Sequence, residues 1–104
     1  MSVVFSPAAN DDLMEIAVFI AQDNPKRALS FVDELEDKCQ VLGVSPGIGT
    51  CRPELGEGVL MLPHGRYVIF YREAEQGIRI ERILHSSRDI DDGDIAESEP
   101  TPSD

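Results

Sequence analysis

The stretch from Arg66 to Arg88 constrains the fold most, because it predicts two paired strands that need cover from other segments. Residues 67–71 are an unbroken run of β-branched and aromatic side chains, which is typical of a short strand covered on both faces. A turn ending at Gly77 follows, because glycine adopts positive φ readily, and residues 78–84 return as the second strand. An isolated hairpin is only marginally stable, so the remaining segments must cover it.

The returning strand changes the phase of its apolar alternation. Ile78 and Ile80 share one face with Arg82. Ile83, by contrast, falls on the face of Glu81. A β-bulge would shift the phase, and so would burial that changes sides along the strand. The sequence leaves both alternatives open.

Two helices are predicted before the hairpin, and both begin with the same signal. The dipeptides at residues 6–7 and 24–25 each place a capping side chain before a proline, which suits the first helical position. Apolar residues then recur at helical spacing to about Gln22 in the first helix and to Gly43 in the second. Because few residues separate the helices, we expect them to form an antiparallel pair.

Short β-prone segments at residues 2–6 and 59–62 complete the predicted elements. Their order is β-α-α-β-β-β, which indicates an α+β fold with a helical hairpin packed on one face of a small antiparallel sheet. No helix remains for the other face, although residues 67–71 are apolar on both faces. An apolar face without cover typically marks a partner site, so we expect a docking surface there.

The chain of 104 residues suits a single domain, with a globular part over residues 1–90 and an acidic tail over residues 91–104. The formal net charge is −11, and residues 89–104 hold seven acids and no base. We expect the tail to be mostly disordered and solubilising, or alternatively to shield basic residues of the hairpin, namely Arg66, Arg82 or Arg88. A nucleic-acid partner normally requires a basic face, so direct nucleic-acid binding is not favoured.

Neither a membrane span nor a secretory signal is indicated, which predicts a cytoplasmic protein without a membrane partner. Cys39 and Cys51 fit neither a disulfide framework nor a zinc motif, so we expect buried or bystander thiols. His64 falls in a predicted turn and should face solvent. Since neither His64 nor His85 has a cysteine or histidine at ligand spacing, we expect no metal and no cofactor.

Four segments, in this order, carry a family resemblance: FSPAANDDLMEIAVFIAQDNPKRALSFVDELEDKC, SPGIGTCRPEL, GRYVIFYR and IRIERILHSSRDI. Together they span about residues 3–90 and resemble the ParE branch of the RelE/ParE toxin superfamily, from bacterial type II toxin–antitoxin modules. The resemblance implies the same β-α-α-β-β-β fold. It also implies a toxin, of a kind known from plasmid stabilization, that a cognate antitoxin holds inactive in a hetero-oligomer by wrapping grooves beside the helices and sheet.

Two activities of the superfamily compete as the function that the resemblance implies. ParE-like members poison DNA gyrase, whereas RelE-like members are ribosome-dependent endoribonucleases that cut mRNA. A third class has lost toxicity and acts only within the antitoxin complex. A nuclease would need cations and proton-transfer groups, for which the candidates are Arg66, Arg82, His85 and Arg88, with Glu54 as a possible base.

The distribution of basic residues favours a gyrase inhibitor over an enzyme. The nuclease branch relies on dense lysines and arginines and on a late tyrosine. This chain has no lysine after Lys38 and no tyrosine after Tyr71, and its net charge is −11. We therefore expect a binding protein whose target- or antitoxin-binding residues lie on the hairpin: Tyr67, Ile69, Tyr71, Arg82, His85 and Arg88.

Several of these residues also have an ordinary structural explanation. His85, at the end of a strand, could simply bond a backbone carbonyl. Arg88 and Asp89 could form a local ion pair. Tyr67 and Tyr71 could belong to the core instead of a binding surface.

Overall fold

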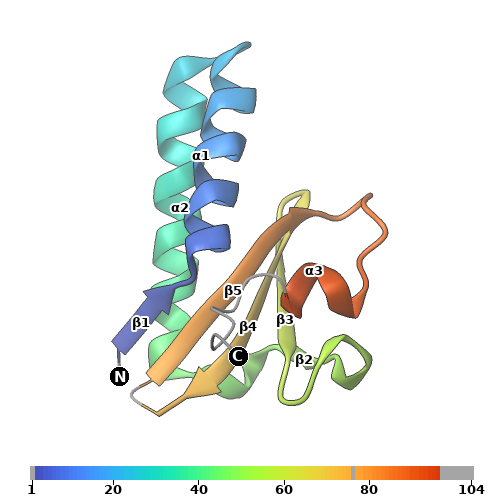
Figure 1. The fold of residues 1–104 in the computed structure, drawn as a ribbon. Helices are drawn as coiled ribbons and strands as arrows, with labels where there is room; N and C mark the ends of the chain where they lie inside the picture. The colour runs from blue at the N-terminus through green and yellow to red at the C-terminus, as the bar shows by residue number, and fades with distance from the viewer. Residues whose placement is uncertain (1, 76, 97–104) are drawn as a thin grey trace.

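The structure is a computed structural model that describes residues 2–75 and 77–96. Two long helices pair side by side against a twisted sheet, and their far ends extend beyond it (Figure 1). The elements follow the predicted order, with a two-residue strand, two single 3-10 turns and a short third helix added. In chain order they are β1 (Ser2–Phe5), α1 (Pro7–Ala21), α2 (Pro25–Val44), η1 (Pro46–Ile48), β2 (Thr50–Cys51), η2 (Pro53–Leu55), β3 (Leu60–His64), β4 (Tyr67–Ala74), β5 (Gly77–His85) and α3 (Asp92–Ala96).

The sheet has five strands in the order β1-β5-β4-β3-β2, and it is mixed. The α+β class and the packing of the helical pair on one sheet face are confirmed. The expectation of a purely antiparallel sheet was wrong at β1, which runs parallel to β5 and pairs Ser2 with Gly77. Because β1 runs parallel to β5, α1 begins beside the middle of β5. With the opposite direction, α1 would start beside Gly77, at the end of the sheet.

The start of α1 is bonded directly to β5 at Ser6. The amide N–H of Ser6 donates to the carbonyl oxygen of Ile80 at 2.9 Å, and its hydroxyl donates to that of Glu81 at 2.7 Å. The same hydroxyl oxygen accepts the N–H of Ala9 at 2.9 Å, so it also caps the helix as predicted. The second predicted cap is present too, because the side chain of Asn24 accepts the N–H of Arg27.

The main core lies between the helical pair and one face of the sheet. Tyr71 is completely buried in it, and its hydroxyl donates to the carbonyl oxygen of Pro46 at 2.8 Å and accepts the N–H of Gly49 at 2.9 Å. These bonds fix η1 against the sheet. The other buried members come from both helices and from β4 and β5: Ala9, Ile16, Phe31, Leu35, Cys39, Leu42, Ile69, Ile78, Ile80 and Ile83.

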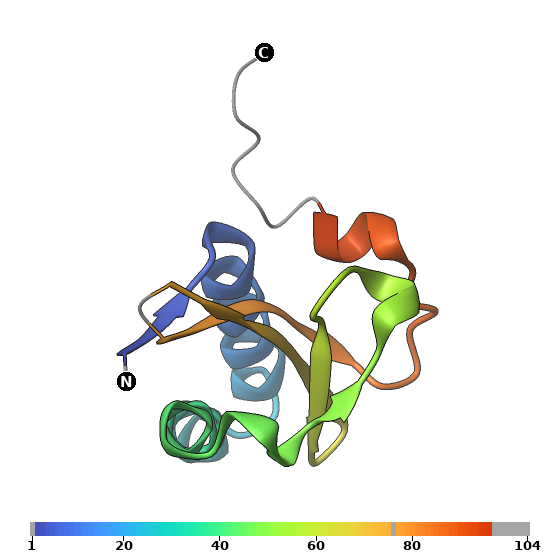
Figure 2. The same cartoon turned by 90° about the horizontal axis from the view of Figure 1, so that it is seen from below.

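The second face of the sheet is covered, so the expectation of an open apolar face there was wrong. Val68, Phe70 and Leu84 on this face are all buried. Their cover includes Leu55 of η2 and Ile95 of α3, which are buried as well. Figure 2 shows the helical pair on one side of the sheet and α3, with the loop around η2, on the other. The short helices η2 and α3 thus cover a sheet face for which the sequence has no long helix.

The first part of the predicted tail is folded. Residues 92–96 form α3, in which the carboxylate of Asp94 pairs with Arg88 and its carbonyl oxygen accepts from Arg82 Nη1 at 3.1 Å. This is the shielding of Arg82 and Arg88 that we considered as the alternative role of the acidic segment. The rest of that tail, residues 97–104, lies outside the described residues.

A bulge in β5 accounts for the change of phase in the hairpin. The register shifts between Phe70 and Tyr71, which leaves Glu81 without an opposite residue. The Glu81 side chain is completely buried and forms ion pairs with Arg72 Nε at 2.7 Å and Arg79 Nε at 3.0 Å. Isoleucines on both sides of the bulge therefore reach the same core: Ile78, Ile80 and Ile83.

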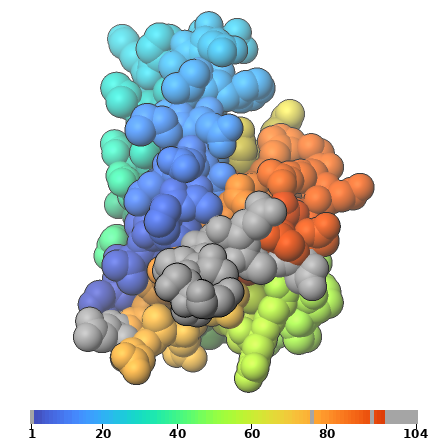
Figure 3. Space-filling model, in the orientation of Figure 1, coloured from blue at the N-terminus to red at the C-terminus, as the bar shows by residue number. Residues whose placement is uncertain are grey.

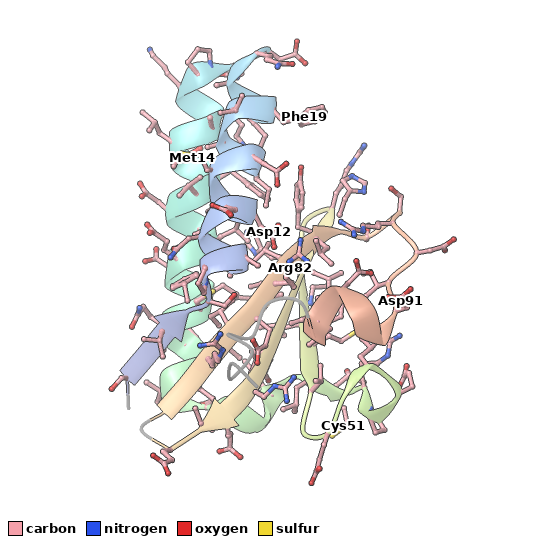
Figure 4. The ribbon with its side chains drawn as sticks, viewed as in Figure 1. Asp12, Met14, Phe19, Cys51, Arg82 and Asp91 are labelled. Carbon is pink, nitrogen blue, oxygen red and sulfur yellow. The ribbon has the colours of Figure 1, made fainter. Side chains whose placement is uncertain are left out.

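Asp12 holds α1 against the part of β5 that lies beyond β1. Its carboxylate accepts the backbone N–H of Ile83 at 2.9 Å and two bonds from Arg82, from Nε at 2.8 Å and from Nη2 at 3.0 Å. The two side chains are only 4% and 13% exposed, and Figure 4 shows them facing each other between α1 and β5. A charge pair removed from water in this way is costly to break, because the loss of Asp12 would take the acceptor of three hydrogen bonds from donors at a buried site.

We expect Asp12→Ala to lower the free energy of unfolding by about 3 kcal/mol, because it removes the carboxylate that accepts two bonds from the largely buried Arg82 guanidinium and one from the Ile83 N–H group. Urea denaturation followed by circular dichroism measures the change. The matched control is Asp11→Ala, which removes an exposed carboxylate from the same helix and should change stability by less than about 0.5 kcal/mol. Equal effects of the two substitutions would contradict this role of Asp12.

Candidate functional site

Two adjoining hollows mark the place where α1 and α2 extend past the end of β5. One, of about 350 Å³, reaches Glu15 and Arg88, and the other, of about 410 Å³, reaches Arg66. They share Phe19, Tyr67 and His85, so we treat them as one feature, the β5-end groove. In Figure 3 the tips of the helices rise beyond the sheet and the surface falls away beside them. Figure 4 shows Phe19 projecting from the end of α1 on this side.

Four rings form a row, and three of them, Phe31, Tyr67 and His85, line the groove. The ring centroid of Phe31 lies 5.5 Å from that of His64 and 5.6 Å from that of Tyr67. Tyr67 in turn meets His85 edge-on at 5.2 Å. The guanidinium carbon of Arg27 lies 5.0 Å from the centre of the Phe31 ring, within cation–π range. The row joins α2 to the ends of β3, β4 and β5, and it gives the groove a preformed apolar floor.

The hydrogen bonds of His85 determine which ring nitrogen carries the proton. Nδ1 accepts the backbone N–H of Ser87 at 3.1 Å and lies 2.7 Å from the Ser87 hydroxyl. Because a backbone N–H can only donate, Nδ1 is unprotonated and the neutral ring carries its proton on Nε2. His85 therefore presents an N–H donor, and its basic nitrogen is already occupied. This arrangement suits binding better than proton abstraction.

The four residues considered for RNA cleavage do not form one catalytic cluster. His85 and Arg66 line the same hollow, and Arg88 lies at the other end of the groove. Arg88 is paired with Asp94, and Arg82 is largely buried in its bonds to Asp12. A cradle for a pentavalent phosphate needs its cations free and convergent.

Glu54, considered as a base, lies on η2 and is paired with Arg52. The hydrogen bond from Arg52 lowers the pKa of the Glu54 carboxyl, which makes the carboxylate a weaker base. Neither hollow of the β5-end groove is lined by Glu54. Glu54 is therefore not placed to act as a base beside His85.

The apolar residues proposed for binding have different environments. Ile69 and Tyr71 are completely buried in the helix-facing core, so their side chains offer no surface to a partner in this fold. Tyr67 is partly buried and lines the groove, which keeps it available for contact. Of the predicted binding residues, Tyr67, His85 and Arg88 line the groove.

His64 does not face solvent as predicted. It belongs to β3 and pairs with Tyr67, because the strand at residues 59–62 extends further than the sequence indicated. Its Nε2 lies 3.1 Å from a carboxylate oxygen of Glu34 on α2. Hydrogen bonds from Arg27 and then from His64 lower the pKa of Glu34, so this carboxylate stays ionised and ties the strand end to the helix.

A second surface is the outer face of the helical pair, where the resemblance implied antitoxin grooves but the sequence analysis named no residues. Met14, Val18 and Leu29 are among its exposed apolar side chains, and a hollow of about 480 Å³ between α1 and α2 adjoins Val18 and Leu29. We call these three residues the helical apolar face. The signal was present, because Met14 and Val18 lie four residues apart and off the stripe that enters the core. Exposed apolar patches of this kind are typical of protein interaction surfaces.

Metal and membrane sites were searched over the described residues. Within residues 2–75 and 77–96, no group of three or more His, Cys, Asp or Glu side chains is placed to hold a metal ion. None of the helices in that part of the chain is both long and apolar enough to cross a bilayer.

Comparison with solved structures places this arrangement in the class of toxin–antitoxin toxins. A chain described as the "Chromosomal ParDE TA system from P. aeruginosa" aligns with a TM-score of 0.68 and 25% sequence identity, over 82% of this chain and 95% of that chain. The sequence profile described as "ParE toxin of type II toxin-antitoxin system, parDE" matches residues 3–90. The chain therefore belongs to the ParE toxin family. A comparison with curated proteins found no match.

The two cysteines should differ sharply in reactivity. Burial raises the pKa of the Cys39 thiol to about 12, whereas Cys51 is exposed on the edge strand β2. We expect iodoacetamide at pH 8 to modify Cys51 at least about 100-fold faster, because only a thiolate reacts and Cys39 is both protonated and covered. Mass spectrometry of the peptides measures this ratio. In urea the two rates should converge, and comparable rates in the folded protein would contradict the burial of Cys39.

Proposed function

We propose that the protein is the toxin of a type II toxin–antitoxin module, that it inhibits DNA gyrase in the cytoplasm, and that a cognate antitoxin neutralises it. Membership of the ParE family supports the module, and the similar P. aeruginosa structure is described as a chromosomal ParDE TA system. Such a module would stabilise the replicon that carries it. The observation that carries the proposal is the pairing of two exposed surfaces, the helical apolar face and the β5-end groove.

The helical apolar face is the proposed antitoxin site. It offers exposed apolar side chains beside a hollow between two helices, which suits an amphipathic segment laid along the pair. This revises the site expected on the second sheet face, where Leu55 and Ile95 now provide cover. A toxin bound there would form a hetero-oligomer with its antitoxin.

The β5-end groove is the proposed target site. Its residues Tyr67, His85 and Arg88 stand among those expected from the sequence to contact a target. The restrained positions of Arg82 and Arg88 and the proton on His85 Nε2 favour binding over cleavage. The net charge of −11 also disfavours the approach of a ribosome-dependent nuclease to RNA.

Two assays run in parallel separate the activities. We expect purified toxin to inhibit supercoiling by gyrase holoenzyme and to leave mRNA intact on primed ribosomes, because its cations do not converge on a phosphate site. Supercoiling is followed on agarose gels and cleavage by primer extension. Cleavage that His85→Ala abolishes would overturn the proposal in favour of a nuclease. Unchanged growth at confirmed expression, with neither activity, would indicate a non-toxic member.

Substitutions on the helical apolar face test the antitoxin site. We expect Val18→Asp and Leu29→Asp each to weaken binding to the product of the neighbouring open reading frame by at least about ten-fold, because each buries an unpaired carboxylate in the interface. Isothermal titration calorimetry measures the affinity. Leu29 is 72% exposed, so the free toxin should stay folded. The control Val44→Asp alters a side chain that is 84% exposed at the end of α2, and equal weakening by this control would contradict the site.

A further inference from the structure

The half of the β5-end groove beside Arg66 is cationic, although the protein as a whole carries a net charge of −11. Its lining contains Arg27, Arg66 and His85 and no acidic side chain. The opposite half, by contrast, is lined by Asp12 and Glu15. A local reversal of charge in a strongly acidic protein selects for an anionic group at one defined place.

The donors in this half are available to a ligand. Within the described residues, the Arg66 guanidinium has neither a hydrogen bond nor an ion pair. His85 presents the N–H of Nε2, because Nδ1 is held by Ser87. Arg27 is neutralised by Glu34 and packs over Phe31, so it contributes a flat apolar wall more than a free charge. The site therefore offers one free cation and one neutral donor, which suits a carboxylate.

The floor between these donors is apolar and preformed. Phe31 is buried and Tyr67 partly buried, and their ring centroids lie 5.6 Å apart. The exposed ring of Phe19 borders the same hollow. A cavity of about 410 Å³ with this lining has room for one large apolar side chain. The combination calls for a ligand that carries an apolar anchor next to a carboxylate.

The distribution of acids argues against a nucleic acid in this place. A polynucleotide carries a phosphate at every step and requires several cations along its path. Glu15 and Asp12 line the groove on the other side of His85, and Arg88 there is paired with Asp94. A second phosphate would meet the exposed carboxylate of Glu15, whereas Asp12 is buried and already paired with Arg82. A peptide can place its charges next to Arg66 and leave the opposite half uncharged.

We propose that the Arg66 half of the β5-end groove binds an acidic segment of the protein target, whose apolar side chain packs on Phe31 and Tyr67 while a neighbouring carboxylate pairs with Arg66 and His85. The inference rests on the proposed function, since it names the chemistry of the target segment. The test does not use gyrase, so the peptide site and the proposed inhibition of gyrase can be refuted separately.

The probe is a fluorescein-labelled hexapeptide with four carboxylates around a Leu-Phe pair, compared with a peptide in which Asn and Gln replace the acids. Full-length toxin is titrated into each, and anisotropy gives the affinity. We expect the acidic peptide to bind at least about ten-fold more tightly than its amide counterpart, because only a carboxylate forms a charge-assisted pair. Arg66→Glu should remove that preference.

Lys38→Glu is the matched control, since it makes the same change of charge on α2 and Lys38 does not line this hollow. It should reduce peptide affinity by less than about two-fold, as expected for a screened surface charge. Arg66 is exposed, so Arg66→Glu should keep the thermal unfolding temperature of the wild type, and this is measured alongside. Equal binding of the two peptides, or equal losses in the two variants, overturns the proposal.

Two further measurements exclude other occupants. A labelled hexauridylate that binds more tightly than the acidic peptide, and that Arg66→Glu releases, would assign the groove to nucleic acid and overturn the peptide. If Arg66→Glu lowers the affinity for the antitoxin as much as the affinity for the peptide, the groove would be assigned to the antitoxin and the proposal overturned. If instead peptide binding behaves as expected while supercoiling is not inhibited, the groove stands and gyrase is excluded as the target.

Discussion

The fold depends on how α1 completes the edge of β5 that β1 leaves open. The pairing of β1 with β5 ends at Phe5 and Ile80. After Ile80, the backbone groups on this edge of β5 have no neighbouring strand, and such groups are costly to bury unpaired. The Ser6 hydroxyl donates a hydrogen bond to the carbonyl oxygen of Glu81, and the Asp12 carboxylate accepts one from the N–H of Ile83. The first two turns of α1 and its cap thus supply hydrogen-bond partners for backbone groups of β5 where no strand does. The same contacts set α1 over the end of the sheet, and the β5-end groove exists because the helix continues past that point.

Long, regular elements were predictable from the sequence, and single turns were not. The capped helix starts at residues 6–7 and 24–25 and the hairpin at residues 66–88 all carry repeating or paired signals. A one-turn helix such as α3 has no period to detect, and its acidic composition resembles that of a disordered tail. The informative signal was a single aliphatic residue, Ile95, set among acids. The segment was judged by its overall acidic composition, in which one isoleucine counts for little. The second sheet face was therefore expected to be open.

The candidate site shows why neighbours in sequence need not share a role. Arg82, His85 and Arg88 lie within seven residues, yet the first is bound to α1, the second faces the groove and the third is paired with α3. Arg82 and His85 are three residues apart in β5 and therefore point to opposite faces of the sheet, and Arg88 lies beyond the end of the strand. Sequence reasoning found the correct strand end. It could not find the partners, because Asp12 and Asp94 come from segments 70 and 12 residues away from Arg82.

The parallel pairing of the first strand with the last has a consequence for the order of folding. The bond between Ser6 and Glu81 joins residues separated by 75 positions, and that between Asp12 and Ile83 joins residues separated by 71. During synthesis, β1 and the start of α1 must wait until β5 has been made. Closing so long a loop is entropically costly and slow compared with forming the helical pair. In a nascent chain of this protein the helical pair therefore forms first, and the surface that would act on a target is assembled only after β5 has been translated.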